Sequence, residues 1–503
     1  MNRNSLIALA CLPALLAAED PKAELRIQIE DAAARPLPCR IHLFDASDKP
    51  IRPPGYPCWR DHFVCDGRAT LQLPNGNYRY EIERGPEHER LMGKLELKGV
   101  QTLKLQMKRI ADLTKQGWYS GDLHIHRPPA DIELLMKAED LHVGPVITWW
   151  NQRNLWMGRD LPRSALTKFD GNRFHEVMGG EDERGGGALL YFHLSEPLAI
   201  TKAAREFPSP LAFANEARKK NKNVWIDVEK PFWWDAPTWI ASGTIDSVGI
   251  ANNHMCRSQA YPGEAWGKAR DEKRLPPPMG NGQWTQEIYY HVLNCGFRIP
   301  PSAGSASGVL PNPVGYNRVY VHVDGQLTWE KWWAGLKAGR SFVTNGPLLL
   351  VTANGKMPGA VFTSTEKMEI KIEAALQSLD RVANIEIVRD GKVIESLKVD
   401  KPAEFKGSFT IPFKESGWFL VRAIADNDKT FRFASTAPFY VEVGKNKTRV
   451  SKASATFFRD WTNERIERLH AALKDEKQLA DVLKPHGEAK AIWQALIEKA
   501  NAD

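Results

Sequence analysis

The feature that most constrains this chain is an alternation of strand-like and helix-like segments between about residues 117 and 340. Residues 131–142 repeat apolar side chains at helical spacing, and residues 143–148 follow with the pattern of a buried strand. Further helices are expected at residues 209–220, 285–296 and 328–339. Because repeated strand–helix units of this length close most naturally into a barrel, the sequence predicts a βα barrel as the central domain.

Strand-like segments of alternating polarity flank this region on both sides. Residues 22–110 contain short runs of this kind, and a hairpin is expected around Asp390-Gly391 in the second flank. The amino-acid sequence of residues 67–78 resembles that of carboxypeptidase-regulatory-like accessory domains. The expected fold is therefore multidomain, α/β plus β, with a barrel between two β-sandwiches and a helical tail. The expected boundaries are residues 19–112 for the first sandwich, 113–340 for the barrel, 341–445 for the second sandwich and 446–503 for the tail.

Residues 1–18 have the layout of a secretory signal peptide. An apolar run at residues 6–16 is followed by the small residues Ala17 and Ala18. A lipoprotein site at Cys11 would leave an apolar stump behind it, so the pattern favours a cleaved signal and a secreted or periplasmic protein. After signal removal no run is long enough to span a bilayer.

Charge and cysteine content argue against two classes of function. The net charge of +7 is small for 503 residues, and the basic residues are interleaved with acidic ones, so nucleic-acid binding has little support. The five cysteines after the signal are an odd set in a long chain and do not indicate a disulfide scaffold, although Cys58 and Cys65 could pair in an oxidising compartment. The oligomeric state is not specified by the sequence.

The stretch at residues 117–126 places potential metal or acid–base groups at alternate positions. In a strand, Asp122, His124 and His126 share one face. Two imidazoles and a carboxylate that converge on one point can hold a divalent metal, whereas an isolated His-x-His can also be an exposed polar strand face. The predicted barrel places this stretch at the carboxyl end of its first strand, where α/β barrels keep their sites.

The sequence Gly121-Asp-Leu-His-Ile-His126, together with residues 339–349 and 354–359, resembles the polymerase and histidinol phosphatase (PHP) metalloesterases, and within them the CehA/McbA-type metallohydrolases. The similarity covers roughly residues 117–440. It implies a distorted barrel of about seven βα units, up to three metals at its mouth, and ester or phosphoester hydrolysis. By position, His124, His126 and the candidate bridging acid Glu181 match ligands of that family.

Several other ligand positions of the family are changed. Tryptophans occupy the Asp and His positions in Thr148-Trp-Trp-Asn151, and Gly187-Ala188 stands where Gly-His is expected. Lys230-Pro231 replaces His-Pro, and Gly304-Ser-Ala-Ser-Gly308 replaces Gly-Ser-Asp-x-His. A trinuclear site therefore needs substitute ligands. The available substitutes are Asp182, Asp227, Glu229 and His254.

Two hypotheses follow. In the first, a hydrolase holds one divalent ion (Zn, Mn or Fe) through His124, His126 and Glu181. Its expected catalytic residues complete the shell, stabilise developing charge or orient an imidazole, and they are Asp227, Glu229, Lys230 and Asp122. In the second, the protein has lost catalysis and acts as a carbohydrate-binding or structural protein.

Tryptophans at two expected strand ends suggest a flat ligand. The pairs Trp149-Trp150 and Trp233-Trp234 would wall a groove at the barrel mouth, where Asp235 could bind hydroxyl groups. Aromatic faces beside acids suit a sugar ring, although paired tryptophans also pack protein cores. The expected partner is a small-molecule or saccharide substrate.

Overall fold

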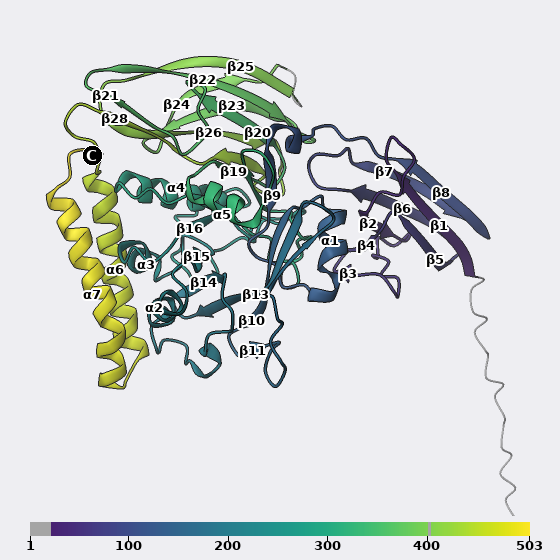
Figure 1. Cartoon of the computed structure of the whole chain (residues 1–503), viewed down its shortest axis with the longest axis horizontal. Coiled ribbons are helices and arrows are strands. Elements are labelled where there is room, and N and C mark those ends of the chain that lie inside the picture. The colour runs from purple at the N-terminus through teal and green to yellow at the C-terminus, as the bar shows by residue number, and fades with distance from the viewer. Residues whose placement is uncertain (1–21, 401–403) are drawn as a thin grey trace, which may run out of the picture.

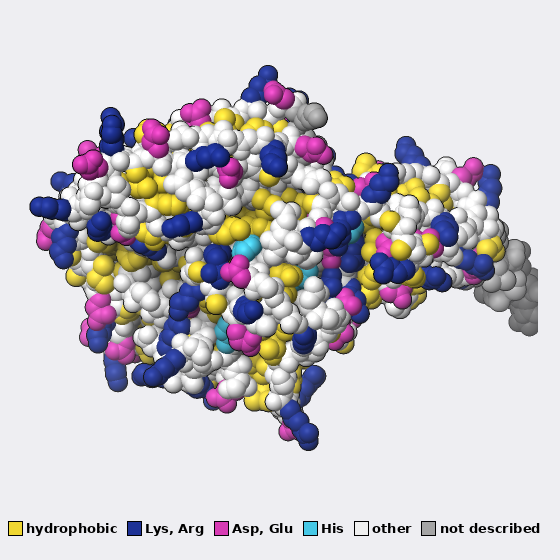
Figure 2. Space-filling view, turned by 45° about the horizontal axis from the view of Figure 1, so that its top comes forward, with side chains coloured by type: hydrophobic (Ala, Val, Ile, Leu, Met, Phe, Trp, Pro, Cys, Tyr) yellow, Lys and Arg dark blue, Asp and Glu magenta, His cyan; other side chains and the backbone are white. Residues whose placement is uncertain are grey.

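The computed structural model describes residues 22–400 and 404–503. The predicted signal peptide and Cys11 lie outside these residues. Figure 1 shows the N-terminal sheets at one end of the molecule, a central region that carries most of the shorter helices, the C-terminal sheets above it, and two long helices along the opposite edge. The face in Figure 2 mixes Lys and Arg with Asp and Glu.

Two sheets form the N-terminal region. Their orders are β5-β1-β8 and β3-β4-β2-β6-β7. Strand β5 alternates buried Ala69, Leu71 and Leu73 with exposed polar residues, because successive side chains of a strand point to opposite faces. The buried faces of both sheets share one apolar core. The strands are β1 Lys22–Glu30, β2 Cys39–Phe44, β3 Cys58–Trp59, β4 His62–Cys65, β5 Arg68–Pro74, β6 Gly76–Glu83, β7 Leu91–Leu97 and β8 Val100–Gln106.

The cysteines of this region are not arranged as expected. Cys39 and Cys65 are directly opposite in β2 and β4, with 4.0 Å between their Sγ atoms. The Cys58 thiol instead donates to the carbonyl oxygen of Pro53 at 3.5 Å. The cross-strand neighbour of Cys65 is therefore Cys39, and the five cysteines of the described chain are free thiols.

The strands of the central region belong to one closed sheet, which continues into the C-terminal region through the pairing of β19 with β27. The central strands are β9 Trp118–Gly121, β10 Val143–Trp150, β11 Arg153–Asn154, β12 Leu166–Phe169, β13 Arg173–Arg184, β14 Gly187–Phe192, β15 Trp225–Val228, β16 Ser247–Ala251, β17 Pro301–Ala303, β18 Arg318–His322 and β19 Ser341–Thr344.

Helices of the central region begin at the expected caps in two cases. The Ser209 hydroxyl accepts from the Leu211 N–H, and the Thr328 hydroxyl accepts from the Lys331 N–H. The expected start at Thr285 is wrong, because this helix begins five residues earlier and buries Thr285. The helices are α1 Ile132–Ala138, α2 Pro210–Lys220, α3 Ala236–Ala241, α4 Gly280–Asn294 and α5 Trp329–Lys337.

The predicted fold class, with a (βα)7 barrel at its centre, is wrong. Strands predominate, with 38% strand and 21% helix. Pairings β13–β14, β14–β15 and β18–β9 are antiparallel, whereas repeated strand–helix–strand units produce parallel neighbours. A tight turn at Gly185-Gly186, and not a helix, joins β13 to β14. The prediction of parallel strands was wrong because local periodicity identifies a strand but not the direction of its neighbour in the sheet.

The C-terminal region adds a three-stranded sheet, β20-β22-β25, to the closed sheet. The expected hairpin is present between β23 and β24, where Asp390 and Gly391 both have positive φ. The strands are β20 Leu348–Ala353, β21 Val361–Ser364, β22 Met368–Gln377, β23 Val382–Arg389, β24 Lys392–Lys398, β25 Glu404–Phe413, β26 Gly417–Ala425, β27 Phe433–Thr436 and β28 Phe439–Val443.

Two long helices, α6 (Lys452–Ala472) and α7 (Glu476–Glu498), lie along the edge of the central region (Figure 1). They bury Trp461 and Trp493, and Arg465 of α6 donates to the Asp235 carboxylate at 2.6 Å. This buried ion pair connects α6 to the N-terminal end of α3, which Asp235 precedes. Within the residues that the structure describes, none of the helices combines the length and apolarity needed to cross a membrane.

Glu176 of β13 gives the fold a pH dependence that can be measured. Burial raises the pKa of this carboxyl to about 8, although the His193 N–H donates to it at 2.9 Å. The unfolded chain releases this proton near pH 4.5 whereas the folded protein keeps it to about pH 8, so stability falls as pH rises through this window. We expect Glu176→Gln to raise the unfolding temperature at pH 8 by about 2 to 4 °C and to leave it unchanged at pH 4. Thermal unfolding followed by circular dichroism measures this, and equal shifts at both pH values would contradict it.

Candidate metal centre

The segment that carries the two histidines lies between two neighbours that fix its backbone. Ile125 O accepts from the Ile147 N–H of β10 at 2.7 Å, and His126 N–H donates to Ser307 O at 2.8 Å. Leu123 N–H donates to Ala303 O at 3.0 Å. The His-x-His pair is therefore held on both sides by backbone hydrogen bonds.

Asp122 holds the backbone around this segment. Its Oδ1 accepts from the His124 N–H and the Ser305 N–H, each at 3.0 Å. Its Oδ2 accepts from the Ser305 hydroxyl at 2.5 Å and from the Gly315 N–H at 2.7 Å. Burial raises the pKa of Asp122, and these four donors oppose that effect. We expected Asp122 to orient an imidazole, but it orients the main chain instead.

Residues 304–308 pack directly on the histidines. A Cβ atom on Gly304 would lie 2.4 Å from His124 Cβ, and one on Gly308 would lie 2.6 Å from His126 O. Gly308 also has φ +102, which strains any other residue. Residues 304–308 thus position the His-x-His, with Ser305 as the donor to Asp122.

Three potential ligand atoms converge at the histidines. The Nε2 atoms of His124 and His126 are 2.9 Å apart, and Oε2 of Glu181 lies 3.4 Å from the first and 3.1 Å from the second. His124 and Glu181 are buried, and His126 is partly exposed. We call this the metal group. All of its ligand atoms lie within 4.8 Å of one another, as in sites that hold a metal ion.

Glu229, which follows β15, fixes the orientation of one imidazole. Its Oε1 lies 3.3 Å from Nδ1 of His124, and its carboxylate accepts from Lys230 Nζ at 2.6 Å and from Trp233 Nε1 at 3.0 Å. A histidine that donates Nδ1–H to a carboxylate presents a lone pair at Nε2. Glu229 therefore supports His124 from behind, and Lys230 compensates its charge.

Without an ion, the metal group is a coupled acid–base system. Burial lowers the pKa of His124, but Glu181 and Glu229 outweigh it and raise this pKa to about 10. Burial would raise the pKa of Glu181, yet His124 and His126 hold it well below the usual range. The pKa of Glu229 falls to about 2, because Lys230 and His124 outweigh its burial. The carboxylates are thus charged at neutral pH, as metal ligands and their supports must be.

Glu183 is a further candidate residue of this site that the sequence pattern had not singled out. It lies two residues after Glu181 on β13, so both side chains point to the same face of the strand. Its Oε2 accepts from Trp150 Nε1 at 3.1 Å. Burial and the nearby Glu181 raise its pKa to about 7. The alternate spacing Glu181-x-Glu183 was the available signal.

Asp227 is buried beside the metal group without joining it. Its Oδ1 accepts from the hydroxyls of Ser247, at 2.5 Å, and Ser302. Burial raises its pKa to about 6, although these two hydrogen bonds lower it. The other two residues that were expected as substitute metal ligands, Asp182 and His254, also have other partners. Asp182 pairs with Arg184, and His254 Nδ1 faces Gly263 O at 3.1 Å.

The structure does not bring the four predicted groove tryptophans together. Trp149 is 1% exposed, and its Nε1 donates to Met178 O within the core. Trp150 is partly exposed, and its ring centroid lies 4.9 Å from that of His126. Of this pair, only Trp150 borders the metal group, because alternate residues of β10 face opposite sides.

The second pair is also divided. Trp233 donates to Glu229 and packs against the tilted ring of Trp266, with 4.9 Å between ring centroids. Trp234 packs against α6, where the Arg468 guanidinium lies 3.8 Å from its ring centroid. Asp235 is 2% exposed and binds Arg465, so it fastens α6 and cannot reach a sugar hydroxyl.

A second trio of potential ligands lies in the N-terminal sheets: His42, Asp61 and His62. The Asp61 carboxylate faces Nδ1 of His42 at 3.2 Å and Nδ1 of His62 at 3.1 Å. Nε2 of His42 accepts from Arg40 Nε at 3.0 Å. A neutral imidazole has one lone pair, so His42 carries its proton on Nδ1 and donates it toward Asp61. The His62–Asp61 hydrogen bond and the Arg40 donor occupy most ligand atoms of this trio, and Nδ1 of His42 keeps only its contact with Asp61. We therefore interpret the trio as hydrogen-bonded.

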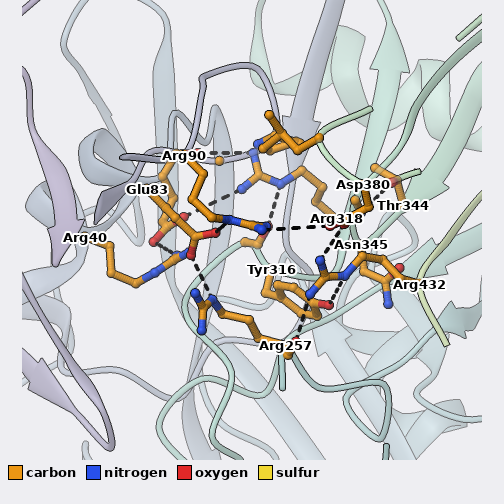
Figure 3. Close-up of a pocket in the computed structure, with 16 residues that line it drawn as sticks. Arg40, Glu83, Arg90, Arg257, Tyr316, Arg318, Thr344, Asn345, Asp380 and Arg432 are labelled. Atoms are coloured by element: carbon orange, nitrogen blue, oxygen red, sulfur yellow. Dashed lines mark hydrogen bonds and ion pairs between the residues drawn. The ribbon is translucent and has the colours of Figure 1, made fainter. Parts of the chain in front are cut away.

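An arginine-rich pocket lies where the N-terminal, central and C-terminal regions meet (Figure 3). None of its lining residues belongs to the metal group. Its guanidinium groups face carboxylates: Arg40 and Arg257 both pair with Glu83, and Arg432 pairs with Asp380 at 2.5 Å. We therefore interpret this pocket as an ion-pair network that joins the three regions.

No protein-family model matches this chain, and no curated protein matches it. Among solved structures, a CARDB domain from Pyrococcus furiosus is 18% identical, covers 19% of this chain and 94% of its own length, and has a TM-score of 0.15. Its crystal structure in complex with di-metal ions is 16% identical, with 20% and 90% coverage and a TM-score of 0.14. Fibronectin(III)-like modules of CbhA from Clostridium thermocellum are 18% identical, with 18% and 94% coverage and a TM-score of 0.13. Matches this partial assign neither a fold nor a function to the chain.

Proposed function

We propose that this protein is a secreted, metal-dependent hydrolase of the ester or phosphoester class. His124, His126 and Glu181 would hold a single divalent ion, with Zn, Mn and Fe as the candidates. The resemblance of the His-x-His segment to PHP metalloesterases of the CehA/McbA type belongs to this proposal. The substrate would be a small molecule or a saccharide derivative.

One observation carries the proposal. Glu181 Oε2 is buried and accepts no conventional hydrogen bond, although it lies within 3.4 Å of two imidazole nitrogens. Without an ion, a proton on His124 supplies the donor in this cluster. Once both imidazoles are unprotonated at Nε2, the three atoms that face one another are acceptors that a cation can bind. Buried acceptors without a donor are costly, and a cation between them removes that cost. The donor set of two imidazoles and one carboxylate fits zinc and its neighbours in the first transition row.

The surrounding residues could perform the remaining tasks of hydrolysis. A divalent ion held in the group would polarise the ester oxygen and lower the pKa of a water molecule. Glu183, which lies on the same face of β13 as Glu181, could accept a proton from that water. Glu229 keeps His124 in the tautomer that binds metal, and Lys230 places a positive charge beside the group.

We expect Glu181→Gln to lose the ion and with it hydrolysis, because the neutral amide cannot replace a charged ligand. Hydrolysis of 4-nitrophenyl acetate and of bis(4-nitrophenyl) phosphate should fall at least about 100-fold. The matched control is Glu196→Gln, which removes an exposed carboxylate paired with Lys220. Unchanged rates in Glu181→Gln, or an equal loss in the control, would refute the assigned site.

Metal content measured on the same preparations separates the two hypotheses. Protein that retains one equivalent of metal and hydrolyses either ester behaves as proposed. Protein that does not bind metal and does not hydrolyse either ester would instead support a non-catalytic carbohydrate-binding or structural role.

A further inference from the structure

An open cleft of about 590 Å³ lies beside the metal group. One wall is the loop at residues 55–59 from the N-terminal sheets, and the other is the segment at residues 126–131. His126 lines this cleft and also supplies Nε2 to the metal group. A molecule bound in the cleft is therefore adjacent to the metal group.

Arg127 is the unusual residue of this cleft. Its side chain is 5% exposed, its Nη2 donates to Cys58 O at 3.1 Å, and its Nη1 has no partner. Among the described residues it forms no ion pair, whereas each of the other buried arginines does, as Arg184 does with Asp182 and Arg270 with Glu264. Arg127 thus holds a buried positive charge with no described carboxylate at ion-pair distance, although Asp131 lines the same cleft.

Trp59 keeps this guanidinium in place. The Arg127 guanidinium carbon lies 5.7 Å from the Trp59 ring centroid, and that of the exposed Arg60 lies 5.2 Å from it. Trp59 is itself fixed, since its Nε1 donates to Leu310 O at 2.7 Å. Arg127 therefore joins the two walls of the cleft through Trp59 and Cys58, and the lining residues include a single carboxylate, Asp131.

We propose that this cleft binds an oxyanion group of the substrate through Arg127, with Trp59 holding the guanidinium. An unpaired buried charge is unfavourable unless a ligand supplies the opposite charge. A guanidinium matches carboxylate, sulfate and phosphate groups because its donors form a planar fork. The identification of the bound molecule as a substrate rests on the proposed function, but the anion site itself does not. The N-terminal region then takes part in selecting substrates.

The test uses full-length protein from which metal has been removed with a chelator, so that added anions cannot bind an ion. Thermal unfolding is followed while inorganic phosphate, sulfate or acetate is titrated into wild type, Arg127→Met and Arg68→Met. Arg68 is an exposed arginine of β5 and serves as the matched control. We expect at least one of the three anions to raise the unfolding temperature of wild type and of the control. Arg127→Met should bind that anion about tenfold more weakly, as the loss of a charge-assisted hydrogen bond implies.

A second signature distinguishes anion binding from a structural role. Without anion, Arg127→Met should unfold at a higher temperature than wild type, because it removes an unpaired buried charge. If this variant fails to fold, Arg127→Lys takes its place, and its anion affinity should again fall because lysine lacks the fork. Equal anion affinity in wild type and the folded Arg127 variant, or no response of wild type to any of the anions, would overturn the inference. Anion binding without hydrolysis would leave it standing while refuting the proposed function.

Discussion

Joint replacement of His124 and His126 by alanine is expected to abolish metal retention. The double variant lacks two of the three converging ligand atoms. A single carboxylate binds a divalent ion too weakly to retain it during purification. Protein purified without chelator should contain about one equivalent of metal as wild type and less than about a tenth of that as the double variant. Elemental analysis by mass spectrometry measures both values. The unfolding temperature should fall as well, because bound metal stabilises the folded state.

The matched control for this experiment is His470→Ala, an exposed histidine of α6. A second control, His42→Ala with His62→Ala, removes the other histidine trio, which we interpret as hydrogen-bonded. Both controls should keep their metal. Equal metal content in wild type and in the His124/His126 double variant would reject the site, and loss of metal from the His42/His62 variant would move it to the N-terminal sheets.

Asp140→Asn is expected to destabilise the fold by about 3 to 5 kcal/mol, the range for breaking a buried ion pair. The carboxylate of Asp140 is buried among Arg84 at 3.2 Å, Arg109 at 2.5 Å and Arg173. Burial would raise its pKa, but the three guanidinium groups hold this pKa well below the usual range. The amide would remove the negative charge that these three guanidinium groups share where the N-terminal and central regions meet. Denaturant unfolding near neutral pH measures the loss.

The backbone makes this substitution a clean one, because Asp140 has φ +50 and asparagine tolerates that conformation. Asp170→Asn is the matched control: Asp170 also pairs with Arg173, but its side chain is 44% exposed, so the loss should stay within about 1 kcal/mol. The depressed pKa further predicts that wild type gains stability from Asp140 above about pH 4 and loses it as pH falls below that value, while Asp140→Asn lacks this dependence. Equal destabilisation by the two variants would show that burial of Asp140 is not the cause.

The metal group was predictable because its chemistry is local. Alternate spacing places His124 and His126 on one face of an extended segment, and the resemblance to a known family pointed to Glu181. The roles of Asp122 and Glu229 were only partly predictable. Each carboxylate was expected near the histidines, but the partner that fixes its role is distant in sequence: Ser305 for Asp122 and His124 for Glu229.

The fold class was not predictable in the same way. The turn at Gly185-Gly186 reverses the chain and makes β13 and β14 antiparallel, whereas the sequence pattern indicated repeated strand–helix units. Trp234 and Asp235 illustrate the same limit. Both follow a strand end, which suggested a ligand groove, yet α6 from the far end of the chain covers them. Contacts between segments this distant in sequence leave no local periodic signal.

The most direct test of the central claim is X-ray diffraction from crystals of protein loaded with zinc or manganese, collected at the absorption edge of the metal. The account predicts one strong anomalous peak between Nε2 of His124, Nε2 of His126 and the Glu181 carboxylate, at about 2.0 to 2.2 Å from each. A peak at His42, Asp61 and His62 instead, or no ordered metal at the metal group, would contradict it.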